Sequence, residues 1–328
     1  MFIFSQQITI VNTTFYKIPM TFLDICGIIL AVKCMKKLIP ILIFIIIILV
    51  ACAPSGESAQ IAATTLPVYE FTLRICQGTD ISVAQLVTEN VSCLHDYTLK
   101  VDQMRIIERA EMIVINGAGL ETFMEDALFT AKNIVDSSEG LTLVEMESHN
   151  HEDEHGHDHG HAHSEDPHIW LSPQNAKAMA ENICNALSKQ YPKYETVFSS
   201  NLQQLLLDID ALQAYGEEKL QDVSCKKLIT FHDGFSYLAE SFDLTILHAI
   251  EEESGAEASA AELIDLTEML RENNLPAIFI EKNGSVSAAN IISAETNTEI
   301  YSLDMAMSGT SYFDAMYHNI DTLQEALQ

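Results

Sequence analysis

The stretch EMIVINGAGLE at residues 111–121 decides the fold class. Its first half is a short continuous apolar run, which is typical of a strand buried in a parallel sheet. Its second half is a turn of small residues that leads into a helix, which we expect at residues 122–131. A strand, a tight turn and a helix in this order make one βα unit, the repeating element of α/β folds.

The same βα pattern recurs on both sides of this stretch. Short apolar runs bounded by turn residues alternate with segments that have helical spacing. Two sets of such units predict an α/β protein with two (βα)4-type lobes, each built on a mostly parallel sheet. The other expected strands are 61–67, 81–87, 227–231, 244–250, 277–281 and 300–304, and the other expected helices are 68–73, 97–109, 172–190, 235–241, 260–273, 287–296 and 312–327.

A long segment rich in Leu, Gln, Asp and Glu joins the two sets of units. It covers residues 193–222, and a helix of this length would span roughly 45 Å. We interpret it as one rigid linking helix between an N-terminal lobe at 61–192 and a C-terminal lobe at 223–328. Two shorter helices that break near Tyr215-Gly216 are the alternative.

A histidine-rich loop at residues 149–165 lies within the predicted N-terminal lobe. Between His149 and His163, seven histidines alternate with Asp, Glu, Gly, Asn and Ala. Such a polar tract cannot pack a core, whereas neutral imidazole is the commonest metal ligand in proteins. The composition therefore predicts a loop that collects divalent metal ions, and a solvated low-complexity loop is the alternative.

The sequence predicts an export signal at residues 1–51. A pair of lysines precedes fourteen uncharged, mostly apolar residues at 38–51. A basic region, a short apolar segment and small residues at the cleavage site are typical of a signal peptide. We expect the true start at Met35 and interpret the upstream part as superfluous.

The tetrad LVAC at residues 49–52 resembles a bacterial lipobox. In that case Cys52 carries lipid and becomes the new N-terminus, and the polar residues that follow it make 52–60 a flexible tether. A signal anchor that is never cleaved is the alternative.

Four cysteines remain in the exported part, and in an oxidising compartment they suggest two disulfides. We favour Cys76 with Cys93 and Cys184 with Cys225, because each pair lies within one predicted lobe or at its edge. Buried free thiols are the alternative.

The charge balance restricts the class of partner. The chain has 17 basic and 47 acidic side chains and a formal net charge of −30. A nucleic-acid-binding protein needs a basic surface, so nucleic acid is excluded as a partner. An excess of negative charge attracts cations over long range.

Three histidines and one aspartate outside the loop lie where one element gives way to the next: His95, His168, His232 and Asp304. Ligands of open α/β sheets bind outside the carboxyl ends of the strands. The four side chains could therefore meet in the cleft between the lobes. Three imidazoles and one carboxylate make a tetrahedral site suited to zinc.

From about residue 61 to its end, the chain resembles the metal-binding solute-binding proteins of bacterial ABC importers, in the group with a rigid linking helix. Several motifs occur in the same order and cover nearly the whole exported chain. They are HDYTL at 95–99, NGAGLE at 116–121, DPHIWLSP at 166–173, ITFHDGFSYLAESFDL at 229–244, IFIEKNGS at 278–285 and LDMAMSG at 303–309.

This resemblance implies a carrier and not an enzyme, with Zn²⁺ as the transported ligand held by His95, His168, His232 and Asp304. His232 stands where manganese-type members usually have a carboxylate, and imidazole suits zinc. The resemblance also implies an ABC importer permease with its ATPase as the partner. It implies a monomer that is lipid-anchored to the outer face of the bacterial cytoplasmic membrane, or periplasmic.

Some features depart from the family pattern or leave alternatives open. Leu94 stands where the family usually has Pro before the first histidine. The fourth ligand is Asp304, Glu281 or water, and Asp96 or Glu281 could instead support a ligand from behind. Alternative functions are a manganese or iron carrier of the same fold, a zinc-dependent hydrolase that keeps an open metal position, and a cell-surface adhesin.

Overall fold

The structure is a computed structural model and describes residues 59–89, 94, 97–145, 165–250 and 259–328. The predictions about the export signal, the lipid on Cys52, the loop at 149–164, His95 and Cys93 lie outside these residues.

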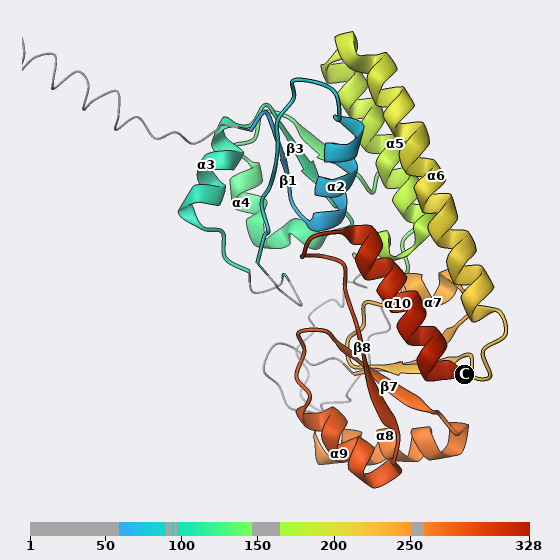
Figure 1. The fold of residues 1–328 in the computed structure, drawn as a ribbon. Helices are drawn as coiled ribbons and strands as arrows, with labels where there is room; N and C mark the ends of the chain where they lie inside the picture. Colours follow the sequence, from blue (N-terminus) through green and yellow to red (C-terminus); the bar gives the residue numbers. More distant parts are fainter. Residues whose placement is uncertain (1–58, 90–93, 95–96, 146–164, 251–258) are drawn as a thin grey trace, which may run out of the picture. The chain divides into compact units, whose positions relative to one another are not determined.

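Within the described residues, eight strands form two four-stranded sheets, and every pairing between strands is parallel (Figure 1). The strand orders are β2-β1-β3-β4 and β6-β5-β7-β8, so both sheets share one topology. The predicted α/β class with two parallel sheets is confirmed. The strands are β1 Ile61–Ala63, β2 Val83–Gln85, β3 Met112–Ile115, β4 Ile134–Asp136, β5 Lys227–Thr230, β6 Thr245–Ala249, β7 Ala277–Glu281 and β8 Glu299–Leu303.

Helices alternate with the strands along the chain. From residue 260 onward, the ranges predicted for three helices and one strand match the observed ones. The helices are α2 Leu66–Ile75, α3 Val101–Arg109, α4 Glu125–Leu128, α5 Pro173–Gln190, α6 Glu195–Leu220, α7 Ser236–Ser241, α8 Ala260–Asn273, α9 Ser287–Thr296 and α10 Tyr312–Leu327, with 3-10 turns η1 Leu120–Met124, η2 Ile169–Leu171 and η3 Pro192–Tyr194.

The stretch at 111–121 forms β3, which lies between β1 and β4 in the first sheet. The turn after β3 needs glycine, because Gly117 has a φ of 86° and a Cβ there would lie 1.8 Å from Oδ1 of Asp136. The helix expected at 122–131 is wrong in extent. It is replaced by η1 and the short α4, because the backbone of Met124, with a φ of −124°, is not helical and separates the two.

α6 is the linking helix, and its 26 residues run without a break through Gly216. A Cβ on Gly216 would lie 2.2 Å from the ring of Phe242, so glycine allows the close approach of these elements. The first half of α6 contacts α2, where Nδ2 of Asn201 donates to the carbonyl of Ile75 at 2.9 Å. Its second half binds α10, where Tyr215 donates to Asp321 at 2.6 Å. One helix therefore contacts helices of both sheets (Figure 1).

Two further contacts join the sheets beside the linking helix. The indole N–H of Trp170 donates to the carbonyl of Met305 at 2.7 Å. The backbone N–H of Leu66 donates to the carbonyl of Met307 at 3.0 Å. Trp170 is completely buried. The segment that follows β8 is thereby fixed against the segment that contains His168. The boundaries of the lobes themselves stay a prediction, since residues 58–328 form one compact unit.

The predicted disulfide between Cys184 and Cys225 is not formed. Cys76, Cys184 and Cys225 are free thiols. Cys184 is buried on α5, against the first sheet, whereas the partly exposed Cys225 precedes β5 of the second sheet, and its thiol donates to the carbonyl of Lys227. Burial raises the pKa of Cys76 to about 12, with a further contribution from Cys184. Both buried thiols therefore behave as core side chains.

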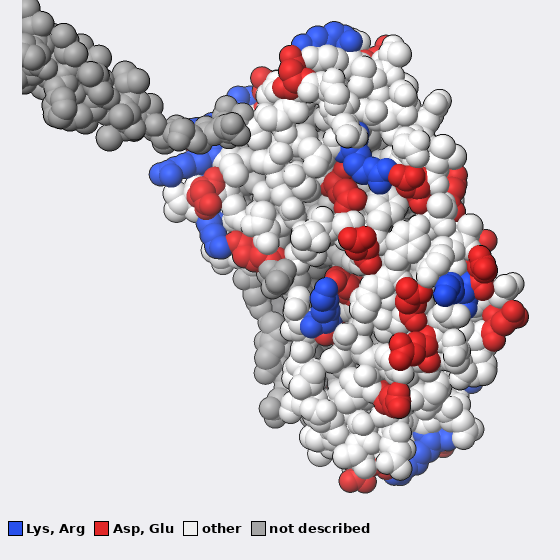
Figure 2. Space-filling view, in the orientation of Figure 1, with Lys and Arg blue, Asp and Glu red and all other residues white. Residues whose placement is uncertain are grey.

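Acidic side chains are more prominent than basic ones on the face that carries α6 and α10 (Figure 2). This agrees with the net charge of −30. Among the residues that the structure describes, each helix is too short or too polar to cross a membrane.

Candidate metal centre

His168 lies at the start of the ordered passage that follows the histidine-rich tract. Its side chain is 4% exposed, and its ring is fixed by Asp166, two residues earlier. Oδ1 of Asp166 accepts from the backbone N–H of His168 at 2.9 Å and lies 2.7 Å from Nδ1 of its ring. A carboxylate can only accept, so this contact keeps the proton on Nδ1 and leaves a lone pair on Nε2.

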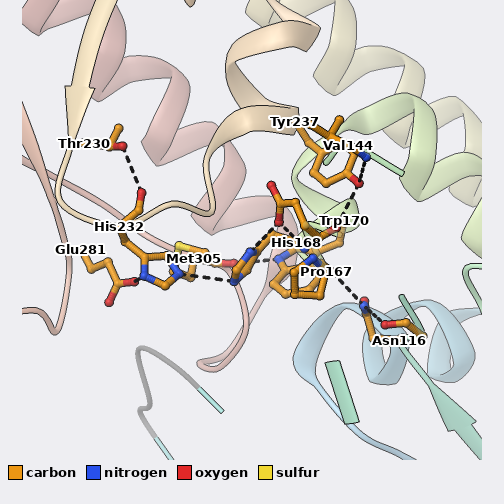
Figure 3. A network of polar contacts seen from close by, with 12 residues as sticks. Asn116, Val144, Pro167, His168, Trp170, Thr230, His232, Tyr237, Glu281 and Met305 are labelled. Atoms are coloured by element: carbon orange, nitrogen blue, oxygen red, sulfur yellow. Dashed lines mark hydrogen bonds and ion pairs between the residues drawn. The ribbon is translucent and has the colours of Figure 1, made fainter. Parts of the chain in front are cut away.

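The base of the histidine-rich tract is fixed beside this residue. Glu145 and Glu165 form an isolated antiparallel bridge, and the N–H of Asp166 donates to the carbonyl of Val144 at 2.8 Å. The hydroxyl of Tyr237 on α7 accepts from the N–H of Val144 and donates to the carbonyl of Asp166, each at 3.0 Å (Figure 3). The tract therefore leaves and rejoins the fold next to His168.

His232 follows β5, at the carboxyl end of the second sheet. Nδ1 of its ring lies 3.1 Å from Oε1 of Glu281, the last residue of β7. This is the same arrangement as at His168, because a buried carboxylate again faces Nδ1. The interpretation of Glu281 as a partner that orients a ligand from behind therefore fits its position better than direct ligation.

The two imidazoles face each other through their other nitrogens. Nε2 of His232 lies 3.5 Å from Nε2 of His168, and the ring planes are nearly perpendicular (Figure 3). Two nitrogens bound to one zinc at about 2.05 Å, at a tetrahedral angle, would be about 3.3 Å apart. Two lone pairs thus converge at the spacing that a shared metal ion requires.

Gly234 makes this approach possible. A Cβ at this position would lie 2.7 Å from Cδ2 of His232, 2.8 Å from Cε of Met305 and 2.9 Å from Cε1 of His168. Any larger side chain would therefore occupy the space of the two rings. The role of Gly234 was missed from the sequence, although its place in the HDG run after a strand was a possible signal.

Asp304 is not brought to the two imidazoles in this structure. It follows β8 as predicted, but its Oδ2 lies 2.8 Å from Nζ of Lys282 and its Oδ1 accepts from the N–H of Ala306 at 2.9 Å. Over the described parts of the chain, no three His, Cys, Asp or Glu side chains are grouped closely enough to hold a metal ion. His95 and Asp96 lie outside the described residues, so the ligand set of four stays a prediction.

Glu121 supports the site from the first sheet. Its carboxylate accepts from the hydroxyl of Thr64 at 2.6 Å and from the backbone N–H groups of Asn116 at 2.7 Å and Gly117 at 3.0 Å. Asn116 in turn donates to the carbonyl of Pro167, the residue before His168, at 3.0 Å. Burial raises the pKa of Glu121 to about 7. No role for Glu121 was predicted from the sequence.

Known proteins are similar to this chain over most of its length. The family model described as zinc-uptake complex component A, periplasmic, matches residues 61–326. The high-affinity zinc uptake system protein ZnuA of Bacillus subtilis is 29% identical over 83% of this chain and 88% of its own length. The manganese ABC transporter substrate-binding lipoprotein PsaA of Streptococcus mitis is 26% identical over 89% of this chain and 99% of its own.

Solved structures give the same result. A crystal structure of ZnuA matches with a TM-score of 0.72 and 28% identity, over 82% of this chain and all of that one. The chain therefore belongs to the family of zinc-uptake complex component A. It is a metal-binding component of ABC-type metal uptake.

Proposed function

We propose that this member of the zinc-uptake family captures Zn²⁺ outside the cytoplasm and delivers it to the permease and ATPase of an ABC importer. The observation that supports zinc is the convergence of two Nε2 atoms, 3.5 Å apart, each on a ring whose Nδ1 faces a buried carboxylate. Imidazole ligands favour zinc, whereas sites rich in carboxylate oxygen favour manganese.

The other ligands, the loop and the lipid anchor in this proposal are predictions from the sequence. His95 would supply the third imidazole and Asp304 the fourth ligand. The tract at 149–165 would bind Zn²⁺ loosely and raise its concentration beside His168, because its base lies there. Lipid on Cys52 would keep the loaded carrier at the membrane, near the permease. Binding requires no open metal position, since no water has to be activated.

A competition titration with Zn²⁺ and Mn²⁺ tests the proposal on the exported chain, residues 53–328. We expect one tight zinc site that survives deletion of residues 149–165 and is lost in His232→Ala. Without metal, His232→Ala should have the same unfolding temperature as the parent. This result would show that the variant has lost a ligand and not its fold.

Two results would contradict the proposal. Loss of tight binding when the loop alone is deleted would move the site into the histidine-rich tract. Equal affinity for Mn²⁺ and Zn²⁺ would favour the second candidate, a manganese carrier, for which the likeness to PsaA provides a specific reason.

A further inference from the structure

The carboxylate of Asp304 is occupied by a cation of the chain itself. Lys282 directly follows Glu281, which orients His232, and its Nζ lies 2.8 Å from Oδ2 of Asp304. The two side chains are 57% and 15% exposed. The ammonium is thus largely in water, while the carboxylate that it covers is largely buried.

The position of Asp304 is fixed by several further contacts. Its backbone N–H donates to Oδ1 of Asn319 at 2.7 Å, and its carbonyl accepts from Nδ2 of the same side chain at 2.7 Å. Oδ1 of Asp304 accepts from the N–H of Ala306 at 2.9 Å. Since these contacts all lie within the segment from β8 to α10, the carboxylate is already ordered, and the bond from Lys282 is the one that the surrounding water could replace.

A cavity beside this ion pair gives the ammonium a place to move. It has a volume of about 260 Å³, and its lining includes Glu281, Lys282, Asp304 and the exposed Asp314. The carboxylate of Glu281 faces His232. One hollow therefore connects the side chain that orients a metal ligand with the ion pair that occupies the predicted fourth ligand.

We propose that Lys282 acts as an internal counter-ion that competes with Zn²⁺ for Asp304. The proposal rests on the proposed function and extends it. In the metal-free protein the ammonium neutralises the carboxylate. When Zn²⁺ binds, Asp304 exchanges the ammonium for the metal, and Lys282 turns into the cavity or the solvent. When the metal leaves, the ammonium returns.

This competition lowers metal affinity by the free energy of the ion pair that must be broken. Pairs with one partner largely in water are weak, so the expected effect is about two- to fivefold in Kd. The same ion pair is broken for every divalent ion, so Lys282 sets affinity and ease of release but does not select the metal. A carrier that must surrender its metal to a permease benefits from such a built-in competitor.

A double-mutant cycle on the exported chain tests this, with Zn²⁺ Kd measured by competition against a chelator. Lys282→Gln should bind Zn²⁺ about two- to fivefold more tightly than the parent. Asp304→Asn should bind about tenfold or more weakly, because a charged ligand is lost. Lys282→Gln in the Asp304→Asn background should leave the Kd unchanged, because no carboxylate remains to compete for.

Lys177→Gln is the matched control. Lys177 pairs with Asp210 at 2.6 Å on the face formed by α5 and α6, so the variant removes the same charge and breaks the same kind of ion pair. Its Kd should equal that of the parent. This control measures how much of any effect comes from net charge alone.

Two results would overturn the inference and still leave zinc capture by His168 and His232 in place. If Lys282→Gln tightens binding equally with and without Asp304, the effect is general charge repulsion. If Asp304→Asn binds like the parent, Asp304 is not a ligand. In either case His232→Ala would still abolish binding. Loss of the proposed function would appear instead as unchanged binding in His232→Ala.

Discussion

Gly234 provides the sharpest test of the metal centre. In Gly234→Ala the new methyl group would lie 2.7 Å from Cδ2 of His232 and 2.9 Å from Cε1 of His168. Carbon atoms in ordinary contact are about 3.5 Å apart or more, so each ring would have to retreat by about 0.6 to 0.8 Å. Cε of Met305, at 2.8 Å, is the end of a flexible chain and can move aside.

The displacement is large on the scale of metal coordination. Metal–ligand distances vary by about 0.2 Å in well-formed sites, so both Nε2 atoms cannot stay in place together. We expect zinc affinity to fall by about 10- to 100-fold, as when the partners that orient metal ligands are removed. Overpacking should also cost about 1–3 kcal/mol in the free energy of unfolding.

Gly216→Ala separates these two effects. It adds a methyl group 2.2 Å from the ring of Phe242 on the linking helix, where none of the predicted ligands lies. We expect it to lower the unfolding temperature and to leave the zinc Kd unchanged. The assay is chelator competition, together with thermal unfolding of each metal-free variant. A folded Gly234→Ala protein with the Kd of the parent would refute the reasoning, because the facing rings could not then be the ligands.

Three further predictions concern Asp166, Glu121 and the free cysteines. Asp166→Ala should weaken zinc binding by about 10- to 100-fold in the same titration, because Nδ1 of His168 loses the carboxylate that fixes its proton; unchanged affinity would show that the contact is not needed. Burial raises the pKa of Glu121 from an ordinary 4.5 to about 7, so the folded state binds the extra proton, and stability falls as pH rises from about 4.5 to about 7. Relative to Glu121→Gln, the parent should lose on the order of 3 kcal/mol over that range in urea unfolding, and parallel pH profiles of the two proteins would contradict this. In unfolded, unreduced protein, a thiol reagent should react with the three described cysteines, Cys76, Cys184 and Cys225. The absence of these reactions would restore the disulfide hypothesis.

The sequence alone was enough to predict the fold class. The run at 111–116 and its counterparts at 227–231 and 277–281 are short and mostly apolar, which is typical of strands buried in a sheet covered on both faces. Helices with clear spacing or caps, such as α8 and α10, were predicted with the observed ends. These are local properties, because propensity, capping and periodicity act within a few residues.

β4 and the segment that forms η1 and α4 were not predicted correctly. β4 has three residues with only Val135 buried, which is too little to stand out from a loop. The helix expected at 122–131 is interrupted at Met124, whose backbone is not helical, and no breaking residue such as Gly or Pro marks this position in the sequence.

The candidate site divides in the same way. Motifs placed His168 and His232 at the ends of elements, and the kind of ligand followed from chemistry. The distance between them depends on two segments 64 residues apart in the chain. The contact of Glu281 with His232 likewise joins two distant strand ends, whereas Asp166 lies only two residues from His168. The pairing of Asp304 with Lys282 and the free thiols of Cys184 and Cys225 were likewise not predicted. The sequence by itself determined which groups and elements exist, since these depend on local chemistry. Only the tertiary structure decided which groups face one another, because that depends on the packing of parallel sheets whose neighbouring strands are distant in the chain.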